Sequence, residues 1–202
     1  MTASVTQKSA ISKPARAQDA PHSDASDASI AASALTLDAL LDLTSAELRV
    51  LYETATVPKL TDARGDLEGR LLASPLLGRR VATGVRALAR SRHFPWRGKS
   101  FTPPGASSSP YDGRGEGINR VFTDRNQWFR FDTFIGKSRA GDFDALQLDY
   151  DNAGNPAFIR IIKDEIRTLR PGLFLGHAYV ALRGKTTLAL YFALADRERA
   201  RR

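Results

Sequence analysis

The sequence contains no cysteine, and this absence excludes disulfide bonds, thiolate nucleophiles and zinc–sulfur sites together. Histidine is also scarce, with three residues that stand far apart in the chain, so we expect neither a metal site nor a cofactor. No apolar run reaches the roughly 18 residues that a transmembrane helix needs, and the N-terminus lacks the apolar core of a signal peptide. These features favour a soluble, cytoplasmic protein.

Acidic residues are missing from residues 69–111, although this stretch holds eight basic residues. The excess that gives the chain its formal net charge of +8 is therefore a local patch and does not characterise the whole chain. Such a patch can attract phosphate groups, anionic lipid or an acidic partner. Its members on a predicted helix are Arg79, Arg80, Arg86 and Arg90.

The chain divides into a tail, one domain and a short charged end. Residues 1–34 include 17 Ala and Ser residues and no aromatic residue, so they cannot bury enough surface to repay ordering and are predicted to be disordered. Residues 35–196 are long enough for a single domain with its own core, and residues 197–202 follow it. Thr44 and Glu47 form a capping box that predicts a helix over 44–56, and Ser74-Pro75 opens a second predicted helix over 75–91.

The rest of the domain consists of short segments rich in aromatic, β-branched and leucine residues, separated by Gly, Pro, Asn or Asp. The predicted strands cover residues 66–73, 96–101, 117–122, 127–135, 143–150, 163–169, 173–182 and 186–194. Strands joined by such short connections pair antiparallel with their neighbours. The sequence therefore predicts a mainly β (α+β) protein, either an antiparallel meander or a lipocalin-like β-barrel with two flanking helices.

The most informative candidate residue is Asp164. Strand alternation places it on the same face as Ile162 and Ile166, and a carboxylate on an inward face needs a charged or hydrogen-bonding partner. We expect Arg130 or Arg97 to supply that partner and the pair to orient a ligand. The alternatives are a structural ion pair at the end of the barrel, or the opposite strand phase with Asp164 in solvent.

Other residues complete the candidate ligand site. His177 shares a face with Leu173, Leu175 and Tyr179, and is either an acid–base group or a packed histidine. Trp96 precedes Arg97, Gly98 and Lys99 and could stack on a ligand, but no recognised nucleic-acid motif accompanies it, so nucleic acid is not an expected partner. The predicted lining of the interior is Phe129, Phe131, Tyr150 and an inner row of the last strand formed by Leu188, Leu190, Phe192 and Leu194.

Several motifs occur together. They are Trp96-Arg-Gly-Lys99, Gly117-Ile-Asn119, Leu148-Asp-Tyr-Asp151 followed by Asn155-Pro156, Asp164-Glu-Ile-Arg167 and Pro171-Gly-Leu-Phe-Leu-Gly176. From about Leu43 to Leu194 this set resembles an uncharacterised family of small bacterial proteins, which has no assigned activity to transfer. More loosely, one helix followed by a meandering barrel is similar to lipocalin-like (calycin) proteins, which hold hydrophobic small molecules. The lipocalin Gly-x-Trp is absent, because Gly65-Asp-Leu and Gly69-Arg-Leu stand where it would be expected.

These observations support three functional hypotheses. The first is that the barrel binds a hydrophobic or amphipathic, lipid-like small molecule in its interior. The second is an enzyme acting on a hydrophobic carbonyl or ester substrate with Asp164 or His177 as the acid–base group. The third is an adaptor whose basic helix binds an anionic membrane or another polyanion. The sequence leaves open whether a reaction is catalysed and what the oligomeric state is.

Overall fold

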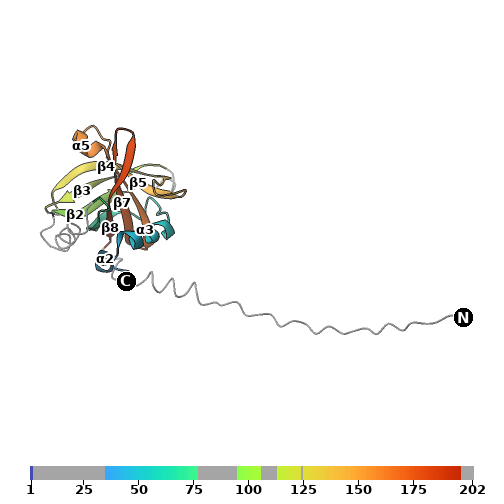
Figure 1. Cartoon of the computed structure of the whole chain (residues 1–202). Helices are drawn as coiled ribbons and strands as arrows, with labels where there is room; N and C mark the ends of the chain where they lie inside the picture. Colours follow the sequence, from blue (N-terminus) through green and yellow to red (C-terminus); the bar gives the residue numbers. More distant parts are fainter. Residues whose placement is uncertain (2–34, 77–94, 106–112, 124, 197–202) are drawn as a thin grey trace.

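The computed structural model describes Met1 and residues 35–76, 95–105, 113–123 and 125–196. Eight strands within these residues form a closed antiparallel barrel (Figure 1). The strands are β1 (Gly65–Ala73), β2 (Trp96–Thr102), β3 (Gly115–Val121), β4 (Gln127–Lys137), β5 (Asp144–Asp149), β6 (Ile162–Arg170), β7 (Leu173–Leu182) and β8 (Lys185–Ala195). Each strand pairs with its neighbours in sequence, and β1 closes the barrel on β8, with Gly69 opposite Leu194. The predicted mainly β barrel is confirmed.

Some predictions fall outside the described residues. They concern the tail over 1–34, nearly all of the second predicted helix (77–94 are not described), its basic residues Arg79, Arg80, Arg86 and Arg90, and the end over 197–202. Within the described residues, no helix is both long and apolar enough to cross a bilayer.

Two short helices cover one side of the barrel, α2 (Leu37–Leu41) and α3 (Ser45–Thr54). The predicted capping box of α3 is present, because the Glu47 amide donates to Thr44 Oγ1 at 3.3 Å and the Thr44 amide donates to Glu47 Oε2 at 2.7 Å. The buried side chains of Leu48 and Tyr52 pack against the outer faces of β7 and β8. This outer core shields that face of the barrel from water and positions the segment that follows α3.

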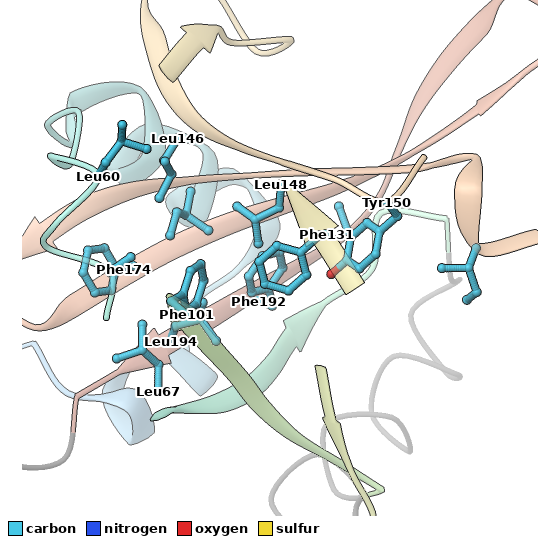
Figure 2. Packing of buried hydrophobic residues seen from close by; sticks show 14 residues of the cluster. Leu60, Leu67, Phe101, Phe131, Leu146, Leu148, Tyr150, Phe174, Phe192 and Leu194 are labelled. Atoms are coloured by element: carbon cyan, nitrogen blue, oxygen red, sulfur yellow. The ribbon is translucent and has the colours of Figure 1, made fainter. Parts of the chain in front are cut away.

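The interior of the barrel holds a second core. Figure 2 shows it running from Leu60 and Phe174 on one side to Tyr150 on the other, with the rings of Phe131 and Phe192 between them. Leu60 and its neighbour Ala63 come from the segment between α3 and β1, and both are almost completely buried. They extend the apolar filling at the end of the barrel where β1 begins.

Two phenylalanines occupy the middle of the interior because glycines face them on adjacent strands. Gly117 of β3 pairs with Phe131 of β4, and Gly176 of β7 pairs with Phe192 of β8. A Cβ at either glycine would overlap the ring of its partner. The glycines therefore make room for two large rings in a barrel whose eight strands leave little internal volume.

Two details of the interior differ from the prediction. Leu190, Phe192 and Leu194 face inward, but Leu188 packs with the outer core. The cause is a register shift in the β7–β8 pairing, where Ala178 pairs with Leu190 but Tyr179 pairs with Leu188, and such a bulge reverses the alternation of side chains.

A short helix that the sequence pattern did not indicate, α5 (Ala157–Arg160), lies between β5 and β6.

We expect Gly176→Ala to lower the free energy of unfolding by about 1–3 kcal/mol, because the added methyl group must displace the ring of Phe192 in a packed interior. Gly154→Ala is the matched control, since the nearest atom to its new Cβ is Asn152 Oδ1 at 3.5 Å. Urea unfolding of the two variants measures the difference. Equal stability of the two would contradict the proposed role of Gly176.

Candidate functional site

A cavity of about 320 Å³ occupies one end of the barrel. It lies where β1, β3, β5 and β7 end and β2, β4, β6 and β8 begin, opposite the end that Leu60 helps to fill. Its floor includes Phe192, which also belongs to the interior core. The residues around it are Leu71, Trp96, Lys99, Asn119, Val121, Phe129, Tyr150, Ile159, Ile162, Asp164, Ala178, Leu190 and Phe192.

Five polar or partly polar residues of this lining form one hydrogen-bonded group, the Lys99 cluster, made of Trp96, Lys99, Asn119, Tyr150 and Asp164. Lys99 is 3% exposed and Asp164 is 5% exposed. The Lys99 ammonium donates to Asp164 Oδ2 at 3.0 Å, to Asn119 Oδ1 at 2.8 Å and to the Tyr150 hydroxyl. All three of its protons are thereby used.

The hydrogen bonds of Asn119 and Tyr150 are also fully assigned. Asn119 Oδ1 accepts from Trp96 Nε1 at 3.0 Å as well as from Lys99, and its amide nitrogen donates to the Tyr150 hydroxyl at 3.0 Å and to the Phe129 carbonyl at 3.4 Å. Tyr150 donates its own proton to Asp164 Oδ2 at 3.1 Å.

One atom of the Lys99 cluster stands apart. Asp164 Oδ1 is buried and has no hydrogen-bond partner among the described residues. Leaving such an acceptor buried and unpaired is costly. Asp164 is one of the residues around the cavity, and Oδ1, which has almost no accessible surface of its own, is the vacant acceptor of this otherwise saturated group among the described residues.

Two effects shift the pKa of Lys99 in opposite directions. Burial lowers the pKa of the ammonium, and the nearby Asp164 carboxylate opposes that shift. The rings of Trp96, Phe131, Tyr150 and Phe192 also lie near Nζ, with centroids 5.1–5.5 Å away, and aromatic faces attract a cation. Burial, followed by the charge of Asp164, raises the pKa of the Tyr150 hydroxyl well above its usual value, so this group stays a neutral phenol.

Asp164 faces the interior, which is one of the two strand phases that the sequence left open, but its predicted partners Arg130 and Arg97 are wrong. Arg130 lies outside the barrel, with a side chain 68% exposed and 3.9 Å from Glu116. Strand alternation explains this position, because Phe129 and Phe131 on either side of Arg130 face the interior. Arg97 stands at a register shift in the β2–β3 pairing and is not part of the cavity lining; its Nε donates to the Phe122 carbonyl at 3.2 Å.

The structure brings most of the other predicted residues together. Trp96, Phe129 and Tyr150 line the cavity, and Phe131 lies beneath it in the interior core. Lys99 and Asn119 also belong to the site, although they were not among the residues predicted for it. A signal was present for Lys99, since it shares a strand face with Phe101, which is an inward position.

His177 belongs to the outer face of the barrel and not to the cavity. It is 1% exposed, its ring stacks on Tyr52 of α3 with centroids 3.6 Å apart, and its Nδ1 lies 3.0 Å from the Tyr179 hydroxyl. The packed-histidine alternative therefore describes its position. Within the described residues, no group of three or more His, Asp or Glu side chains could hold a metal ion.

Glu165, which follows Asp164 on β6, is a second buried carboxylate and points outward. It accepts hydrogen bonds from Tyr52 at 3.0 Å, Ser138 at 2.6 Å and the Arg139 amide at 3.0 Å, and it forms an ion pair with the Arg139 guanidinium at 3.2 Å. These contacts join α3 and the β4–β5 connection to the barrel wall. Its role in the described structure is to anchor these elements.

We expect Lys99→Met to lower the free energy of unfolding by about 3–5 kcal/mol, because it leaves the buried carboxylate of Asp164 without a counter-ion. The double variant Lys99→Met/Asp164→Leu should recover most of this loss, since it removes both charges together. Lys137→Met is the control, because Lys137 is an exposed partner of Asp142 and its removal should change stability little. A double variant as unstable as the single one, measured by urea unfolding, would show that the ion pair is not the cause.

His177 should make the protein less stable in acid. Burial lowers the pKa of its imidazole from 6.5 to about 3, so below pH 6.5 the unfolded chain binds a proton that the folded chain does not. The stabilising effect of keeping His177 neutral is complete above pH 6.5 and is lost as the pH falls. The loss amounts to about 2 kcal/mol by pH 5. Glu165, opposite His177 on the adjacent strand, is paired with Arg139 at 3.2 Å.

Urea unfolding at pH 7 and pH 5 tests this expectation in the wild type and in His177→Phe, which keeps a ring against Tyr52 but cannot titrate. The free energy of unfolding of the variant should fall by about 2 kcal/mol less than that of the wild type between the two pH values. Parallel losses in the two proteins would refute the assignment.

Comparison with known proteins assigns this barrel to no family. No family model, no curated protein and no solved structure matches the chain. The closed barrel of eight strands is the established architecture.

Proposed function

We propose that the barrel binds a small amphipathic molecule, in the manner of a lipocalin-like protein, with its apolar part in the cavity and a hydrogen-bond donor against Asp164. The observation that carries this proposal is Asp164 Oδ1, the vacant acceptor among the described residues of the Lys99 cluster. A ligand hydroxyl or N–H would satisfy it after a small movement of the side chains that cover this atom. The Lys99 cluster would then be a ready-made site for a polar head group.

The cavity wall supports an apolar body for the ligand. Around the Lys99 cluster the lining is aliphatic and aromatic, with Leu71, Val121, Ile162 and Leu190 among its members. A volume of about 320 Å³ is at the lower end of the range for small-molecule sites. Phe131 and Phe192 fill the middle of the barrel, so they would limit how deep a ligand can reach.

Charge favours a neutral head group. Lys99 and Asp164 already neutralise one another at 3.0 Å, and a fatty-acid carboxylate would bring a second anion to a single buried cation. Desolvating an extra charge without a partner costs more than burying a hydroxyl that finds an acceptor. A medium-chain alcohol should therefore bind better than the carboxylate of the same length.

The other two functional hypotheses draw less support from the described residues. An acid–base role of His177 in the cavity would need a rearrangement, because its ring is buried between Tyr52 and the outer face of β7. Asp164 remains open to an acid–base role, but its Oδ2 is held by Lys99 and Tyr150. The basic helix of the adaptor hypothesis lies outside the described residues.

Equilibrium binding of 1-octanol and octanoate tests the proposal, with the fluorescence of Trp96 as the signal in a Trp128→Phe background. We expect octanol to bind at least about tenfold more tightly than octanoate at pH 8, which corresponds to about 1.4 kcal/mol. Ala178→Phe should abolish binding by filling the cavity, whereas Ala181→Phe, on the same strand but outside the lining, should not.

Each result bears on a separate part of the proposal. Failure of both probes to bind, or equal binding in Ala178→Phe, would contradict the cavity as the site. Octanoate binding as tightly as octanol would contradict the donor head group. Asp164→Asn should remove the preference for octanol, because its amide replaces part of the acceptor by a donor.

A further inference from the structure

The mouth of the cavity carries an unusual set of exposed apolar side chains. Of the seven large hydrophobic residues that are exposed among the described residues, five follow or begin the strands at this end of the barrel. They are Leu76, Phe122, Trp128, Phe158 and Leu182, and we call them the rim. Their exposed fractions lie between 46% and 67%.

The strand order explains why residues so far apart in sequence meet at one end. In an antiparallel barrel, the connections β1–β2, β3–β4, β5–β6 and β7–β8 all lie at the same end. Each of these four connections, or a strand residue beside it, contributes a member of the rim. Figure 1 shows α5, which carries Phe158, and the β7–β8 turn at the end away from α2.

The rim is continuous with the cavity on one side. The rings of Phe122 and Trp128 meet edge to face with centroids 5.7 Å apart, and Trp128 meets Phe129 of the cavity wall at 5.9 Å. Phe122 has a φ of 65°, which is strained for an aromatic residue. Its amide donates to the Pro95 carbonyl and its carbonyl accepts from Arg97, so the main chain is held in a conformation that leaves this ring in solvent.

Cations accompany the rim. The β3–β4, β5–β6 and β7–β8 connections, taken as residues 122–126, 151–161 and 182–185, carry four basic side chains and two acidic ones, Asp124 and Asp151. Asp151 is already paired with Arg160 at 2.6 Å. Arg125, Arg183 and Lys185 remain exposed around the mouth.

We propose that the rim docks the mouth of the barrel on the surface of an anionic lipid bilayer. Tryptophan and phenylalanine side chains enter the interfacial region of a bilayer, and lysine and arginine beside them are attracted to anionic head groups. Docking of this kind places the cavity where an amphipathic molecule leaves or enters the lipid, but it does not depend on the identity of that molecule.

Flotation of the full chain with vesicles tests the docking. Vesicles of phosphatidylcholine alone are compared with an equimolar mixture of phosphatidylcholine and phosphatidylglycerol. The wild type should bind the anionic vesicles, and the double variant Phe122→Asn/Phe158→Ser should bind them about tenfold more weakly, because two apolar anchors are lost. Asparagine tolerates positive φ, so this variant is expected to keep its fold.

Val50→Ser is the matched control, since Val50 is 52% exposed but lies on α3, outside the rim. It should bind the vesicles as the wild type does. The chain has two tryptophans, so Trp128 is the only one left in Trp96→Phe. Brominated lipid should quench its fluorescence.

Three results would overturn the docking surface. They are no binding of the wild type to either vesicle, unchanged binding of the rim variant, and loss of binding only when Arg79, Arg86 and Arg90 are changed to Glu. Octanol binding to the rim variant should match that of the wild type. A failure of the docking surface is thereby distinguished from a failure of the proposed ligand site.

Discussion

The buried ion pair of Lys99 and Asp164 is the constraint around which the open end of this barrel is organised. Two opposite charges inside a protein need further hydrogen bonds to offset their desolvation. Here Asn119 from β3 and Tyr150 after β5 supply them to Lys99 and to Asp164 Oδ2, while Asp164 Oδ1 is left without a partner among the described residues. The ion pair thus ties β2 to β6 across the interior, and it requires the register of the strands between them to be correct.

Side chains fill the interior of the barrel at one end, and the cavity lies at the other end for a steric reason. Phe131 and Phe192 cross the interior because Gly117 and Gly176 leave space for them. Beyond this level the inward residues surround a cavity and include the Lys99 cluster. The filled half supplies the apolar burial that stabilises the fold, while the hollow half presents a polar group inside an apolar wall.

Two consecutive acidic residues of β6 contribute to opposite faces of the barrel wall. Asp164 points into the barrel and pairs with Lys99, whereas Glu165 points out and binds Arg139, Ser138 and Tyr52. Alternation along a strand predicts that the two carboxylates lie on opposite sides. It does not predict that both are buried, because that depends on α3 and the β4–β5 connection covering the outer face.

The sequence by itself determined the antiparallel strands, the capping box of α3 and the shared face of Asp164, Ile162 and Ile166, since each of these follows from local spacing and alternation; whether that face points inward was left open. Only the tertiary structure decided that Lys99 is the partner of Asp164, that Arg130 and His177 face away from the cavity, and that Leu188 leaves the inner row. The partner of Asp164 is 65 residues away, and the bulge in β8 reverses the side-chain phase at Leu188. Barrel closure and bulges are long-range properties of strand pairing, so no local pattern encodes them.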